Sequence, residues 1–195
     1  SPHGEYAFQF DTRANTTPRW IEPLSQSLPI EDSNAIKGDV VSVGAWIWAD
    51  SPQKTRTPMI RQGYQEWFNL VEVTKVPTFY SFKVKIPDEE KRIWIAFDPY
   101  LNEPTRGDIY YDGIVVTSAP IENLDRIPTF SDQLGSYGYW DETAFLNLVR
   151  NPSAERGWFT IRPIVDEFGS RILPDLARPS FLLGVAQDFS NLDWF

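Results

Sequence analysis

Two tryptophans two residues apart, Trp46 and Trp48 in the stretch GAWIWAD, are the most distinctive candidates for a binding surface. In a β-strand, residues i and i+2 point to the same face. The two indole rings therefore share one face, and Ala45, Ile47 and Ala49 share the other, which we assign to the core. An indole ring is a flat apolar surface on which a ligand can stack, so the tryptophan face is a candidate contact surface.

Three uses of the tryptophan face stay open on these residues alone. The face contacts a ligand, lies buried beneath the chain that follows Ala119, or contacts another protein. Ser42 and Gly44 lie on the same face and, being small, leave room in front of the rings. We expect neighbouring strands to add three further side chains to this surface, Gln26, Trp67 and Trp94.

Residues for acid–base or metal catalysis are not concentrated anywhere. Hydrolysis of a glycosidic bond needs two carboxyl groups about 5–10 Å apart. The sequence singles out no such pair among its strand and loop carboxylates, which include Asp50, Glu66, Glu72, Asp98 and Asp112. The single histidine is His3 and there are no cysteines. Ser-His-Asp catalysis and multi-histidine or cysteine zinc sites are therefore not expected, and we predict that the protein is not an enzyme.

The overall charge restricts the class of partner. The formal net charge is -9 and the sequence pI is about 4.6. Binding to nucleic acid requires clustered lysine and arginine to neutralise phosphates, so we predict no nucleic-acid partner. No apolar run approaches the roughly 18–20 residues that span a bilayer, so no transmembrane segment is expected in this chain.

The pattern of residues 1–118 predicts an all-β sandwich. About seven short strands are separated by turn signals, and 16 prolines and 15% aromatic residues suit strands and loops. The longest predicted strand runs from Val40 to Ala49. In the strand after Thr78, the side chains expected on one face are Tyr80, Phe82, Val84 and Ile86. In KRIWIAFDP, the side chains expected to point inward are Ile93, Ile95 and Phe97, and those expected outward are Trp94 and Ala96.

Other segments are predicted from turn residues and helical spacing. Residues 31–39 and 50–58 are expected to be loops, and YQEWFNLVEVT, from Tyr64, is expected to be one strand. Residues 119–195 form a loop-rich, partly helical C-terminal extension. Its helices are expected after Asp141 as an N-cap, over Pro163–Leu173, and after Ser180.

The order of phrases from Gly4 to Ala119 resembles the jelly-roll carbohydrate-binding modules attached to bacterial glycoside hydrolases. Five phrases carry the resemblance, and the last contains Asp112: GEYAFQF, PLSQSLPI, KGDVVSVGAWIWA, YSFKVKIP and IYYDGIVV. The resemblance covers about 115 residues, roughly the length of one sandwich. It implies the fold already predicted from the strand pattern.

The resemblance also implies a function. A module of this kind binds sugar by aromatic stacking and hydrogen bonds, without chemistry, in an extracytoplasmic bacterial protein, secreted or at the cell surface. The ligand-binding side chains would be Trp46, Trp48, Gln26, Trp94 and Trp67. Asp112 would hold a structural calcium ion together with backbone carbonyls near the first strand; no other cofactor is implied. The alternative is a structural or protein-interaction domain of a larger cell-envelope or membrane-associated assembly.

One departure from this family concerns its opening strand, which usually reads N-x-x-F-E followed by a tryptophan. Nothing like it precedes Gly4, but a similar string, NPSAERGW, occurs at Asn151 to Trp158. This string either begins a second module within residues 147–160 or folds back to supply the missing strand. Residues 147–163 are also similar to extracytoplasmic segments of large bacterial envelope proteins, some related to membrane glycosyltransferases.

Overall fold

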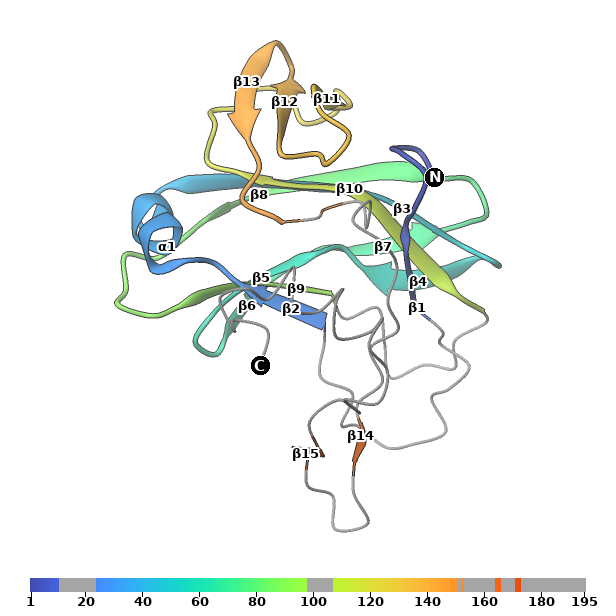
Figure 1. The fold of residues 1–195 in the computed structure, drawn as a ribbon, viewed down its shortest axis with the longest axis horizontal. Coiled ribbons are helices and arrows are strands. Elements are labelled where there is room, and N and C mark those ends of the chain that lie inside the picture. The colour runs from blue at the N-terminus through green and yellow to red at the C-terminus, as the bar shows by residue number, and fades with distance from the viewer. Residues whose placement is uncertain (11–23, 98–106, 151, 153–163, 166–170, 173–195) are drawn as a thin grey trace.

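The chain forms two antiparallel β-sheets packed face to face, with a third, smaller sheet on the outside of one of them (Figure 1). The structure is a computed structural model, and it describes residues 1–10, 24–97, 107–150, 152, 164–165 and 171–172. The predicted all-β sandwich is confirmed. Successive strands mostly cross from one large sheet to the other, as in a jelly roll.

Among the described residues, the two large sheets have four strands each. Sheet A has the order β1-β10-β3-β8, built from β1 (Phe8–Phe10), β3 (Val40–Ala49), β8 (Thr78–Lys85) and β10 (Ile109–Thr117). Sheet B has the order β2-β9-β5-β6, built from β2 (Leu24–Ser27), β5 (Met59–Gln62), β6 (Gln65–Trp67) and β9 (Ile93–Phe97). A separate pair consists of β4 (Gln53–Arg56) and β7 (Leu70–Val73).

The main core lies between sheets A and B, and the alternation in the sequence locates it correctly. Ala45, Ile47 and Ala49 of β3 are fully buried there, as predicted. The predicted inward faces of β8 and β9 also pack into this core, through Tyr80, Phe82, Val84, Ile86, Ile93, Ile95 and Phe97. Each strand of a sandwich has one face against the opposite sheet, so a period of two identifies the core face without other information.

One loop prediction is wrong because a short helix lies there. Residues predicted as a turn-rich connection form α1 (Ile30–Ile36), which buries Ser33 and Ile36. Glu31 and Asp32 in its first turn favour a helix start through the helix dipole. In the part of the chain that the structure describes, no helix is long and apolar enough to cross a membrane.

Two predictions about residues 50–74 also need correction. The predicted polar loop contains β4, whose Thr55 is fully buried with its hydroxyl 2.9 Å from that of Tyr111. The strand predicted from Tyr64 is two strands, because the chain leaves sheet B at Trp67 and pairs with β4 from Leu70. Asn69 marks this corner and exchanges hydrogen bonds with Thr57.

Residues 119–146, here called the cap, form the small sheet over sheet A (Figure 1). Its strands are β11 (Thr129–Phe130), β12 (Tyr137–Trp140) and β13 (Thr143–Leu146). The helix predicted after Asp141 is therefore wrong. Asp141 and Glu142 are the two turn residues of a hairpin, with φ of 48° and 64°. Two positive φ values are the geometry of a type I′ turn, which matches the twist of paired strands.

Further along the extension, the described residues also pair as strands. β14 (Ile164–Val165) pairs with β15 (Arg171–Ile172), so the helix predicted over Pro163–Leu173 is wrong at these residues. The helix predicted after Ser180 lies outside the described residues.

A second core lies between the cap and sheet A. It contains Val115 of β10 and three cap residues, Ile121, Trp140 and Phe145. Phe79, Leu124 and Phe130 pack around it. Trp140 is fully buried, and its Nε1–H donates a 2.7 Å hydrogen bond to the carbonyl oxygen of Arg126. The cap thus has its own apolar attachment to the sandwich.

The chain leaving the cap continues along the free edge of β10. The amide of Leu148 donates to the carbonyl of Val116 at 2.8 Å, and that of Ile114 donates to the carbonyl of Pro152 at 3.2 Å. Val149 joins the main core. Further along, β1 pairs with the same edge of β10, opposite Ile109–Tyr111. Pro152, the one described residue of the NPSAERGW string, therefore lies in line with β1, and whether this string begins a second module or supplies the missing strand stays a prediction.

Candidate functional site

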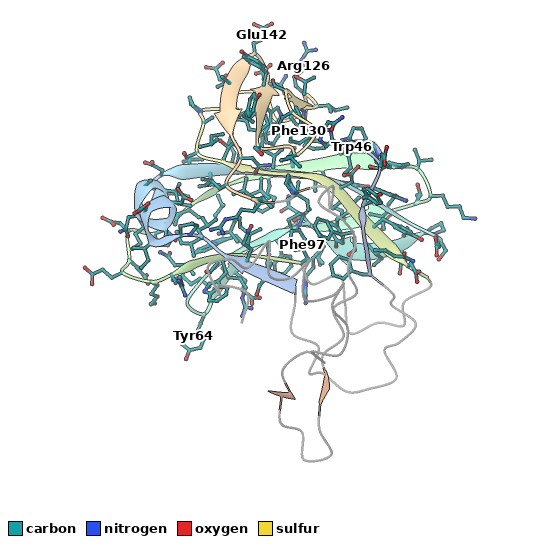
Figure 2. The ribbon with its side chains drawn as sticks, viewed as in Figure 1. Trp46, Tyr64, Phe97, Arg126, Phe130 and Glu142 are labelled. Atoms are coloured by element: carbon teal, nitrogen blue, oxygen red, sulfur yellow. The ribbon has the colours of Figure 1, made fainter. Side chains whose placement is uncertain are left out.

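The tryptophan face is the outer face of sheet A, the side that carries the cap. In the register of the sheet, Trp48 lies opposite Tyr110, and Trp46 lies opposite Asp112 on one side and Phe79 on the other. Both indoles are half-buried. Figure 2 shows Trp46 and Phe130 on the cap side of sheet A and Phe97 between the two sheets. The sequence prediction that the two indoles share the face away from the core is therefore correct.

Trp48 lies at the end of this face that is farther from the cap contact at Gly44. Its ring stacks on that of Tyr110, with centroids 5.3 Å apart and planes at 9°. This stacking uses one face of the indole. The pairing of β3 with β8 begins only at Ile47 and Thr78, so Trp48 lies beyond the end of that pairing. Next to Trp48 the amide of Ala49 donates to the carbonyl oxygen of Thr74 at 2.8 Å, so the chain before β8 borders this end of β3.

Polar groups border the Trp48–Tyr110 pair. The Tyr110 hydroxyl donates to Oδ1 of Asp50 at 3.1 Å, and Oδ2 of Asp50 accepts from the amide of Asp108 at 3.3 Å. Gln9 lies opposite Tyr110 in register, and its Nε2 donates to Oδ2 of Asp108 at 2.5 Å. An aromatic surface with fixed carboxylate and amide groups beside it can stack on a sugar ring and bind its hydroxyls.

Trp46, by contrast, lies at the border of the cap. Its ring meets the edge of Phe79 at 5.7 Å, and Phe79 in turn meets Trp140 at 5.6 Å. The expectation that Gly44 leaves open space is wrong. A Cβ built on Gly44 would collide with the Phe79 ring and lie 3.0 Å from Cη2 of Trp140. The small residue makes room for the cap, so the two tryptophans differ: the aromatic contacts of Trp46 lead under the cap, and those of Trp48 lead away from it.

Gln26 and Trp67 are not on this face. Gln26 belongs to β2 of sheet B, is 2% exposed, and accepts a 3.0 Å hydrogen bond from the amide of Arg150 through Oε1. Trp67 pairs with Ile60 at the edge of sheet B and packs against the main core. Both side chains therefore contribute to the interior between the sheets.

Trp94 occupies a third location. Its neighbours Ile93 and Ile95 point into the core, so Trp94 lies on the outer face of sheet B. The guanidinium carbon of Arg92 is 5.8 Å from its ring centroid. The structure thus does not bring the five predicted ligand-binding residues together. Trp46 and Trp48 share a surface, and the others belong to the opposite sheet, because strand membership cannot be read from the alternation within one strand.

Asp112 is fully buried, and its carboxylate accepts hydrogen bonds. Oδ1 accepts from the amide of Gly113 at 2.7 Å, and Oδ2 accepts from the amide of His3 at 2.7 Å and from the hydroxyl of Ser1 at 2.5 Å. Among the described residues, no three His, Cys, Asp or Glu side chains gather as metal ligands. Calcium binding by Asp112 stays a prediction, which a calcium titration of the EDTA-treated protein, followed by its unfolding midpoint, tests.

Sequence reasoning missed Tyr110 and Gln9 as members of the surface. Their alternation did contain a signal, because Tyr111 faces the core and Tyr110 must therefore face outward. What the alternation could not supply was the register that places Tyr110 beside Trp48 and Gln9 beside Tyr110.

Comparison with known proteins gives only distant similarity. No family model and no curated protein matches the chain. Among solved structures, one described as "CBM4 structure and function" is 22% identical, with a TM-score of 0.36, and the match covers 41% of this chain and 53% of that one. A second, "BiXyn10A CBM1 APO", is 12% identical with a TM-score of 0.31, covering 46% and 55%. The chain spans about half the length of these solved chains.

Proposed function

We propose that the protein is a non-catalytic carbohydrate-binding module that binds sugar on the outer face of sheet A, with Trp48 as its stacking surface. The observation that carries this proposal is the stacked Trp48–Tyr110 pair on that face. The extracytoplasmic location that the sequence resemblance implies is part of the proposal. Binding of this kind needs no proton transfer or nucleophile, so no catalytic residue is assigned.

The chemistry of the surface supports a sugar in particular. A sugar ring has apolar C–H faces and a rim of hydroxyl groups, so its surface matches a ring bordered by acceptors and donors. The Tyr110 hydroxyl is held by Asp50, and Gln9 is held by Asp108, so both polar groups have fixed positions before a ligand arrives. Fixed groups lose less conformational entropy on binding.

The matched pair of variants for this proposal is Trp48→Ala and Trp94→Ala. Both indoles are half-buried on an outer sheet face, but they lie on opposite sheets. We expect the wild-type protein to bind members of a glycan array and to change its tryptophan fluorescence on binding. Trp48→Ala should lose the signal while keeping the wild-type circular dichroism, and Trp94→Ala should keep it. An array without any signal, or binding that survives Trp48→Ala, would reject the proposal.

A second candidate function, a protein-interaction domain, is favoured by the outer surface of the cap. Tyr137, Tyr139 and Leu146 lie on the face of the hairpin away from sheet A and are 51%, 55% and 68% exposed. Contiguous exposed aromatic and aliphatic side chains are typical of protein contact surfaces. This candidate predicts that the glycan array is silent and that Tyr137→Ser with Tyr139→Ser abolishes association with a partner without lowering stability.

A further inference from the structure

We propose that Asp112 and Trp46 form a second sugar subsite, which the chain's own residues Ser1–His3 occupy and which a ligand extending from Trp48 takes over by displacing them. This inference rests on the proposed function of the Trp48 surface. It assigns to Asp112 the role of a hydroxyl acceptor that determines which sugars bind beyond Trp48.

The two subsites are adjacent on one face. Trp46 and Asp112 are register partners, as are Trp48 and Tyr110, and the second pair lies two residues along both strands from the first. Two residues along a strand span about 6.6–6.8 Å. A ligand longer than one sugar unit that stacks on Trp48 and runs along β3 toward Gly44 therefore reaches the Asp112 carboxylate.

The contacts of Ser1–His3 with Asp112 reproduce the hydrogen bonding of a sugar. One carboxylate oxygen, Oδ2, accepts from a hydroxyl group, that of Ser1, and from a second donor, the amide of His3. Two neighbouring hydroxyls of a sugar present the same pair of donors. The imidazole of His3 lies against the Phe130 ring, with centroids 4.3 Å apart, so a ring is already accommodated at this place.

The shape of the place is set by Gly113. Its φ is +52°, and a Cβ there would lie 3.1 Å from Cδ1 of Trp46, 3.3 Å from Cε2 of Phe130 and 3.6 Å from the Cβ of His3. The absence of a side chain at Gly113 thus leaves the space in which His3 lies beside the two aromatic rings. Trp46 and Phe130 form the apolar sides of the subsite, and Asp112 is its polar end.

Two features make Ser1–His3 a displaceable occupant. Ser1, Pro2, Gly4 and Glu5 are exposed, so little apolar surface is buried by this segment, and segments with few buried contacts open at low free-energy cost. In addition, Nε2 of His3 is buried and has no hydrogen-bond partner among the described residues. A buried nitrogen without a partner is unfavourable, and displacement by a ligand restores its hydration.

The test compares His3→Pro with His3→Ala. Both substitutions remove the imidazole, but only proline also removes the N–H that donates to Asp112. The probe is the array glycan with the strongest signal that depends on Trp48, measured in EDTA so that calcium does not contribute. We expect His3→Pro combined with Ser1→Ala to lower its Kd by about three- to tenfold relative to His3→Ala, the range for loss of a competing hydrogen bond. Asp112→Asn should raise the Kd.

Hydrogen exchange distinguishes displacement of Ser1–His3 from a merely structural role, because a segment that stays in place keeps its exchange rate when glycan binds. In the wild-type protein, saturating glycan should accelerate exchange of the His3 amide. If wild type, His3→Ala and His3→Pro with Ser1→Ala have equal Kd values and the exchange rate of the His3 amide is unchanged by glycan, this inference is overturned. The Trp48 proposal is then unaffected. If neither wild type nor His3→Pro gives a signal on the glycan array, both this inference and the Trp48 proposal are rejected. The unfolding midpoint of Asp112→Asn identifies loss of folding, in which case the His3 variants and the exchange rate decide.

Discussion

The indole of Trp140 lies over Gly44, with Cη2 3.0 Å from the position of a Cβ on that glycine. Gly44 belongs to the middle of β3, and Trp140 belongs to the cap, nearly a hundred residues later in the chain. This contact joins the central strand of sheet A to the sheet above it. It also explains why the residue of β3 beneath Trp140 is a glycine.

Gly44→Ala should destabilise the protein. The added methyl group would overlap Phe79 and crowd Trp140, and overpacking of a fixed core costs about 1–3 kcal/mol. Urea unfolding measures the change. In a double-mutant cycle with Phe79→Ala, the methyl group should cost less, because the ring closest to it is gone. An equal cost in both backgrounds would show that Phe79 is not the obstacle.

Trp140→Ala should lower the free energy of unfolding by about 3–5 kcal/mol, as expected for removal of a fully buried large aromatic side chain. Trp140→Phe should cost less, since it keeps much of the packing and loses the hydrogen bond to Arg126. Chemical unfolding followed by far-ultraviolet circular dichroism measures both. The half-buried Trp48→Ala is the control, and a loss as large as that of Trp140→Ala would contradict the assignment of Trp48 to an outer surface.

Asn147→Asp should be severely destabilising despite its nearly identical shape. The Asn147 Nδ2 donates to the carbonyls of Ile114 and Gly135 at 2.7 and 2.9 Å, and a carboxylate would turn an acceptor toward both. Its Oδ1 accepts from the amides of Val116 and Val149. Leaving buried groups without partners costs about 1–3 kcal/mol each. Asn123→Asp, an equal change at an exposed cap residue, is the control and should have little effect on the unfolding midpoint.

Glu142→Gly should stabilise the cap. Glu142 has a φ of 64°, a conformation that costs an L-residue about 1–2 kcal/mol and costs glycine almost nothing. The resulting Asp-Gly turn is also the preferred type I′ sequence. We expect a gain of about 1 kcal/mol in urea unfolding. Glu142→Ala removes the same charge but keeps the Cβ, so a matching gain there would assign the effect to charge instead of backbone conformation.

The sandwich was predictable from the sequence to the extent that single strands reveal their own buried face. β3 and β8 alternate cleanly because one side of each packs on sheet B, and the core residues of both and the bounds of β3 agree with the prediction. The cap was not, because Phe145, Leu146 and Val149 also fit helical spacing. Asp141 and Glu142 adopt the positive φ values of the hairpin turn. Neither is a glycine, so the sequence carries no glycine signal for this turn.

The candidate site was predictable only in part, for a related reason. Trp46 and Trp48 share a face by geometry within one strand. The predicted places of Trp94, Trp67 and Gln26 depend instead on which strands are neighbours of β3. The hydrogen-bonded neighbours of β3 are β8 and β10, so Tyr110 and Phe79 take the places beside the indoles. Strand order depends on long-range pairing, which residue types along one strand do not encode.

The edge of β10 has a consequence for how the polypeptide is connected. Residues 147–150 with Pro152, and β1, lie in line along this edge and run in the same direction, antiparallel to β10. Two segments placed end to end in this way can be connected by a linker in a circularly permuted chain. A permuted chain in which a short linker leads from Pro152 into β1 would begin between β1 and β2 in the native order. The same sandwich would then be assembled with one continuous edge strand.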